Sequence, residues 1–188
     1  MKKEITIYQR KVKNVNFFEF GSLKFIDRIL YKKLIIKLCE NNSLYCLIKK
    51  PKWQIKVMAE ESGFEFYLIR NVCLVKIDSV EKLEKLYYYL VASWNYYFLF
   101  SDKINLVKLL KIREIFLFNP KEEKFNFEIF KFVHTIGNLG HDDLVINLYT
   151  KNYKLEYLKN LLKGIIKKEF EFRDSDKQLF ADELLLSL

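Results

Sequence analysis

The chain has 188 residues, of which 51% are hydrophobic, 30% charged and 16% aromatic. These fractions are typical of a globular protein with a large core. The five Gly and two Pro residues exclude collagen-like, linker-rich and low-complexity chains. The length predicts a single domain over residues 1–188, in which 1–118 form a mixed α+β part and 121–188 a helical part packed on it.

Positive charge is concentrated near the N-terminus. The 33 Lys and Arg residues exceed the 24 Asp and Glu residues and give a net charge of +9, but only five of the basic residues are Arg. Residues 1–56 hold 14 basic and 4 acidic groups, whereas residues 169–188 hold 2 and 6. Lys is a hydrated point charge, so the first third is expected either to attract an anionic partner or to form a solvated surface.

The cysteines and the apolar segments indicate a cytoplasmic protein. Cys39, Cys46 and Cys73 are odd in number, lack metal-site spacing and have apolar neighbours, which predicts buried thiols in a reducing compartment. Charged and polar residues interrupt any signal-peptide core after Met1. The longest uncharged run, Leu86–Ser101, would span about 24 Å as a helix, too short for a bilayer of about 30 Å.

The first half of the chain predicts two strands, a helix and an antiparallel meander. Ser22 is expected to open a helix that ends near Glu40, because apolar residues recur there every three or four positions. Alternating apolar and polar residues predict the strands. The extended runs lie near residues 5–8, 15–20, 43–49, 53–59, 64–70 and 72–77.

A long aromatic helix is expected next. Asp78 and Glu81 have the spacing of a capping box, and the helix is predicted to continue to Phe98. Asn119 and Pro120 then break the chain, and later segments are predicted to be helical. The remaining predictions are helices at 103–111, 125–136, 155–165 and 179–188 and a strand at 112–118. The expected fold class is α+β, an antiparallel sheet of about four to six strands with an N-terminal helix and the long aromatic helix packed on it, followed by a C-terminal helical region.

Few residues suit catalysis. The two histidines, His134 and His141, are weak candidates for a metal site with Asp142, but the intervening glycines favour a helical corner with Asp142 or Asp143 as the N-cap. Phosphate-binding glycine loops, a nucleophile elbow and zinc-type Cys pairs are missing. The sequence therefore predicts neither an enzyme nor a cofactor, and it assigns no catalytic residue.

The preferred hypothesis is a small protein-binding module, such as an inhibitor, antitoxin or immunity protein. The dense aromatic segment contains residue types that are common at binding hot spots, although core packing is the alternative explanation. The partner is expected to be a protein, and an acidic one fits the basic first third. The interface candidates are Tyr88, Trp94, Tyr96 and Tyr97.

The alternative hypothesis is an accessory protein that binds nucleic acid with little sequence preference. Lys contacts to phosphates would make such binding sensitive to salt, and a Trp among lysines would suit base stacking. The candidates for anion or nucleic-acid binding are Lys32, Lys33, Lys37, Lys49, Lys50, Lys52, Trp53 and Lys56.

Overall fold

One nine-stranded sheet forms the centre of the structure, which is a computed structural model. It describes residues 4–22, 26, 28–40, 42–49, 54, 56–58, 60, 63–69, 72–90, 96–101, 127–139, 144–166 and 168–175. The strands are β1 (Glu4–Val12), β2 (Val15–Gly21), β3 (Ser43–Lys49), β4 (Phe66–Ile69), β5 (Val72–Ile77), β6 (Tyr96–Ser101), β7 (Thr135–Leu139), β8 (Val145–Thr150) and β9 (Glu171–Ser175).

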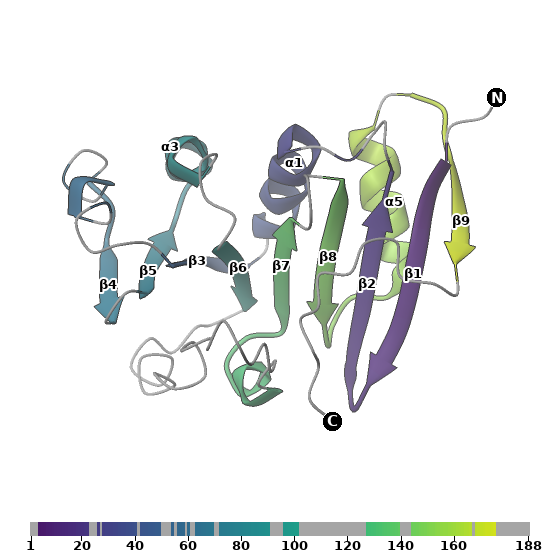
Figure 1. Cartoon of the computed structure of the whole chain (residues 1–188), viewed down its shortest axis with the longest axis horizontal. Coiled ribbons are helices and arrows are strands. Elements are labelled where there is room, and N and C mark those ends of the chain that lie inside the picture. The colour runs from purple at the N-terminus through teal and green to yellow at the C-terminus, as the bar shows by residue number, and fades with distance from the viewer. Residues whose placement is uncertain are drawn as a thin grey trace.

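The strand order mixes early and late parts of the chain. Across the sheet it is β4-β5-β3-β6-β7-β8-β2-β1-β9 (Figure 1). Neighbouring strands are antiparallel except β1 and β9, which run parallel. Because β2 pairs with β8, the first hairpin is joined directly to a strand more than one hundred residues later.

Three helices pack on one face of the sheet: α1 (Arg28–Cys39), α3 (Val80–Leu90) and α5 (Leu155–Ile165). Their apolar side chains share a core with alternate strand residues such as Phe20, Phe98 and Leu148. The opposite face has a second core around Phe17, Leu99 and Tyr149, which includes Ile129 and Phe130 of the short helix η1 (Phe127–Lys131). No described helix is long and apolar enough to cross a membrane.

The structure is α+β, but the predicted arrangement of an antiparallel sheet of four to six strands and a C-terminal helical region is wrong. The sheet is mixed and has nine strands, of which β7, β8 and β9 come from the part expected to be helical. The apolar residues of 125–136 gave a helical spacing, yet among the described residues of this segment only η1 is helical. Tertiary pairing with β6 and β8 overrides that local pattern.

The predicted long aromatic helix is also wrong. The helix α3 ends at Leu90, and Tyr96–Ser101 form β6 in the middle of the sheet. Tyr96, Phe98 and Phe100 face the helices, while Leu99 belongs to the core on the other side. A strand buried on both faces is apolar at every position, so its sequence cannot be distinguished from a buried helix by periodicity.

Two further predictions need correction. Residues 54, 56–58 and 60 are helical, not part of a strand at 53–59. The first helix begins at Arg28 instead of Ser22, because the Ser22 N–H donates to the Leu144 carbonyl at 3.2 Å and keeps Ser22 beside the sheet.

Other predicted elements are confirmed. The early strands, the pairing of β4 with β5 and the helix at 155–165 lie close to their predicted positions. The segments predicted at 103–111, 112–118 and 179–188 lie outside the described residues.

Candidate functional site

A pocket of about 500 Å³ lies where the end of α1 meets the start of α3, at the first residues of β3 and the last residues of β5. One part of its wall is apolar and consists of Ile36, Leu44, Ile77, Val80 and Leu83. The other part is polar and includes Glu40, Asn42, Ser43, Lys76, Asp78 and Ser79. An apolar wall beside a few fixed polar groups is the usual composition of a binding pocket.

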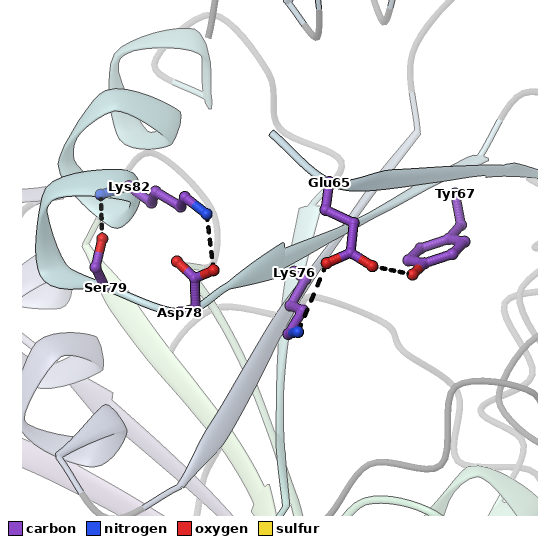
Figure 2. A network of polar contacts seen from close by, with 6 residues as sticks. All are labelled: Glu65, Tyr67, Lys76, Asp78, Ser79 and Lys82. Carbon is purple, nitrogen blue, oxygen red and sulfur yellow. Dashed lines mark hydrogen bonds and ion pairs between the residues drawn. The ribbon is translucent and has the colours of Figure 1, made fainter. Parts of the chain in front are cut away.

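The start of α3 fixes one side of this pocket. The Lys82 N–H donates to Ser79 Oγ at 3.1 Å, so Ser79 caps the helix and not Asp78 as the capping-box spacing indicated. Asp78 instead accepts a hydrogen bond of 2.7 Å from Lys82 Nζ (Figure 2). This hydrogen bond is the largest cause of the lowered pKa of Asp78, so the carboxylate is held in its charged form beside the pocket.

A second cluster of polar side chains comes from Glu65, directly before β4, from Tyr67 of β4 and from Lys76 of β5. The Tyr67 hydroxyl donates to Glu65 Oε1, and Lys76 Nζ lies 3.6 Å from Glu65 Oε2 (Figure 2). The hydrogen bond to Tyr67 lowers the pKa of Glu65 and raises the pKa of Tyr67 to about 12. Since Lys76 also lines the pocket, this group forms a polar rim that connects the pocket to β4.

A buried hydrogen-bond network supports the pocket from behind. His134, which is 8% exposed, places Nε2 2.9 Å from Asn42 Oδ1 and Nδ1 2.8 Å from Thr135 Oγ1. The Asn42 amide nitrogen donates to the Leu38 carbonyl and to the Tyr153 hydroxyl, so the Asn42 oxygen is the acceptor for His134. The Nε2 atom of His134 is therefore the donor to Asn42 Oδ1, and Nδ1 shares the second hydrogen bond with the Thr135 hydroxyl.

This network joins separate elements and offers no reactive group. Thr135 Oγ1 lies 2.7 Å from Thr150 Oγ1, which in turn accepts the N–H groups of Asn152 and Tyr153. Both threonines are fully buried. The network therefore connects β7, β8 and the segment before α5 to Asn42 in the pocket wall, and the role that the structure supports for His134 is structural.

A row of polar residues crosses the other face of the sheet. Glu19 of β2 lies opposite Asn147 of β8, and Asn147 lies opposite Asn138 of β7. All three are buried. Among the described residues, the Asn147 amide, 1% exposed, has no hydrogen-bond partner for Nδ2 or Oδ1, and Asn138 Oδ1 also lacks one. Unbonded polar atoms in a core reduce stability.

The aromatic candidates are not brought together on one surface. Tyr96 is buried, with its ring centroid 5.6 Å from that of Phe98 and 6.5 Å from that of Tyr87. Tyr97 is half-buried on the opposite face of the sheet. Trp94 and the Tyr88 side chain lie outside what the structure describes.

Three of the four basic candidates whose side chains are described lie beside acidic residues. Lys33 is exposed on α1. Three others form ion pairs: Lys32 with Glu84 at 3.4 Å, Lys37 with Glu40 at 2.5 Å and Lys56 with Glu60 at 3.6 Å. Such pairs reduce the positive potential that a phosphate backbone would meet. The structure does not describe Lys50, Lys52, Trp53 or the Lys49 side chain.

Metal ligands do not gather in the described ranges, where no group of three or more His, Cys, Asp or Glu is placed to hold an ion. Of the weak metal candidates, His134 belongs to the network above, and His141 and Asp142 fall outside these ranges. The segment after Asp142 is β8, so the helix that Asp142 was expected to cap does not exist.

Sequence reasoning did not find the pocket. Among its polar residues, Glu40 and Asp78 were named only as the end and the start of predicted helices, and nothing in the spacing of Asn42, Ser43 and Lys76 connects them. Comparison with known proteins adds no information: no family model matches the chain, and no curated protein or solved structure matches it significantly.

Proposed function

We propose that this protein is a protein-binding module, in the manner of an inhibitor, antitoxin or immunity protein, and that the pocket between α1 and α3 receives an apolar side chain of the partner. The observation that carries the proposal is the composition of the pocket, in which an apolar wall lies beside a rim of fixed ion pairs. Binding hot spots commonly combine a desolvated apolar anchor with a polar border.

Exposure at the rim supports this function. Val80, the first residue of α3, is 48% exposed and lines the pocket, so a partner side chain that enters there would also cover Val80. The charges at the rim are already paired within the chain, as Asp78 is with Lys82 and Glu65 with Lys76. A partner therefore gains most by burying apolar surface, which makes binding tolerant of salt.

The test is photo-crosslinking in a lysate of the protein's own host. A photoreactive phenylalanine replaces Val80 in one sample and Ile29 in another; Ile29 is 63% exposed on α1 and does not line the pocket. Each sample is irradiated at about 50 mM and about 500 mM salt, which changes the screening length severalfold. We expect one protein to crosslink to position 80 at both salt concentrations and not to position 29.

A blocked pocket provides the matched control. Ser43→Trp with Val80→Trp places two large side chains on the wall of the pocket, while Ile29→Trp adds the same ring elsewhere. Each variant is then added without the photoreactive residue, as a competitor in the crosslinking at position 80. The double variant should not reduce the crosslink, whereas wild type and Ile29→Trp should reduce it equally. Equal competition by all three proteins, or crosslinks to nucleic acid that disappear at high salt, would overturn the proposal.

A further inference from the structure

The strand β4 forms one end of the sheet. It pairs with β5 on one side, and no described strand pairs with its other side (Figure 1). At the opposite end of the sheet, β9 occupies the equivalent position beside β1. These two outer edges are the places where the described sheet can accept a further strand.

The hydrogen bonds to β5 show which backbone groups of β4 point outward. The Lys76 N–H donates to the Glu65 carbonyl at 3.1 Å, and the register places Tyr67 opposite Leu74. Bonded and non-bonded pairs alternate in an antiparallel ladder. The backbone groups of Glu65 and Tyr67 therefore point toward β5, whereas the N–H and C=O groups of Phe66 and Leu68 point away from it.

The two edges differ in charge. The strand β9 carries Glu171, Arg173 and Asp174, and charged side chains on an edge strand oppose pairing with another sheet. The sequence of β4 is Phe-Tyr-Leu-Ile and contains no charge, and its Phe66 is 38% exposed. Charged side chains therefore protect β9 against pairing with another sheet, whereas β4 contains no charged residue that would do so.

We propose that β4 pairs with β4 of a second copy of this chain, so that two sheets join into one across a two-fold axis at Tyr67. Antiparallel pairing of identical strands is self-complementary. In this register Phe66 lies opposite Leu68 of the second copy. The N–H of each residue donates a hydrogen bond to the C=O of the other. Every outward-pointing backbone group of both β4 strands then has a partner.

No residues of like charge lie opposite each other in this register. Tyr67 lies opposite Tyr67 of the second copy in a non-bonded pair, the closer of the two pair types. Glu65 lies opposite Ile69 of the second copy, and its charge is already compensated by Lys76. The net charge of +9 on each copy opposes dimerisation, and salt screens this repulsion. The dimer is therefore expected to tighten as salt increases.

Sedimentation velocity of the full chain over about 1–100 μM protein tests the dimer. Leu68→Pro removes an outward N–H and leaves the hydrogen bonds to β5, whereas Leu68→Val keeps the N–H with a side chain of similar size. Wild type and Leu68→Val should dimerise, and Leu68→Pro should dimerise at least about tenfold more weakly with an unchanged circular dichroism spectrum. A monomeric wild type, or equal dimerisation of all three proteins, would overturn the proposal.

Crosslinking tests the register itself. Tyr67→Cys places two thiols across the axis, where the expected Cα separation of about 4.5 Å is within disulfide range, and Phe66→Cys does not. Burial raises the pKa of Cys39 and Cys73 to about 12, so the native thiols react slowly in comparison. Disulfide dimers should form with Tyr67→Cys only. Equal yields from both positions would reject this axis.

Neither experiment depends on a partner in the pocket. The proposed dimer and the proposed function can therefore be disproved independently of each other.

Discussion

At the scale of single residues, similar side chains have opposite effects on stability. Asn42 is half-buried and Asn147 is buried, but Asn42 donates two hydrogen bonds and accepts one from His134, while neither polar atom of the Asn147 side chain has a partner within the described part of the chain. A buried amide that is fully bonded stabilises the fold, and one without partners opposes it. Asn42 and Asn147 are the same residue type in the sequence, and only their surroundings in the structure distinguish them.

This difference gives a prediction with an internal control. Asn147→Leu removes two unbonded polar atoms from the core and is expected to raise the free energy of unfolding by about 1–3 kcal/mol. Asn42→Leu breaks the network around His134 and is expected to lower it by a similar amount. Urea denaturation of both variants checks the signs. Destabilisation of equal size at both positions would show that the Asn147 amide is bonded in solution.

Tyr67 and Glu65 predict an unusual titration. Because Tyr67 donates to Glu65, the pKa of Tyr67 is about 12, and Glu65→Gln should shift it downward toward its ordinary value of 10.0. The raised pKa means that this hydrogen bond contributes to stability below pH 10.0 and that the contribution is lost as pH rises through about 12. NMR titration of ring-labelled tyrosine, with Tyr67→Phe to assign the signal, measures the shift. A signal that does not move in Glu65→Gln contradicts the hydrogen bond.

At the scale of elements, Gly137 allows α1 and β8 to approach β7 closely. A Cβ atom on Gly137 would lie 3.1 Å from Leu148 Cδ2 and 3.2 Å from the Tyr31 hydroxyl oxygen. Tyr31 is fully buried, and its hydroxyl has no hydrogen-bond partner in the described ranges. Burial is the largest cause that raises the Tyr31 pKa well above 10.0. The glycine is needed here because the tyrosine of α1 lies directly on the strand.

A double-mutant cycle measures this contact. Gly137→Ala is expected to lower the free energy of unfolding by about 1–3 kcal/mol, because the added methyl group overpacks the core. In a Tyr31→Phe background the loss should be smaller, since one of the two crowded atoms is gone. Thermal and urea unfolding of the four proteins gives the coupling energy. An identical loss in both backgrounds would mean that Leu148 alone causes the overpacking.

At the scale of the whole molecule, stability should decrease from the centre of the sheet toward its ends. The strand β8 pairs on both sides and is buried along its length, whereas β9 pairs only with β1 in the described part and is exposed or half-buried at each residue. Amides in central strands usually exchange through global unfolding and those at edges through local opening.

Hydrogen exchange followed by NMR tests this gradient. Amides of Val145–Thr150 are expected to exchange at least about a hundredfold more slowly than those of Glu171–Ser175, corresponding to a difference in opening free energy of about 3 kcal/mol. Added urea should accelerate the β8 amides more steeply, because global unfolding exposes more surface. Equal rates and equal urea dependence in the two strands would contradict the gradient.

Local sequence determined the elements whose pattern has one clear period. The helix α5 and the early strands were predicted because apolar residues recur at helical spacing in α5 and partly alternate with polar ones in β1 and β2. The capping-box spacing of Asp78 and Glu81 also located the start of α3 to within one residue of the observed cap, Ser79, because capping is a local interaction.

Tertiary structure alone decided the centre of the sheet and the candidate site. Tyr96–Ser101 and Thr135–Leu139 are largely buried on both faces, so neither sequence shows a regular alternation from which strand could be distinguished from helix. The pocket and the His134 network combine Asn42, Lys76 and His134, which lie far apart in the chain. Their proximity depends on long-range pairing of strands, and a single sequence carries no local signal for such pairing.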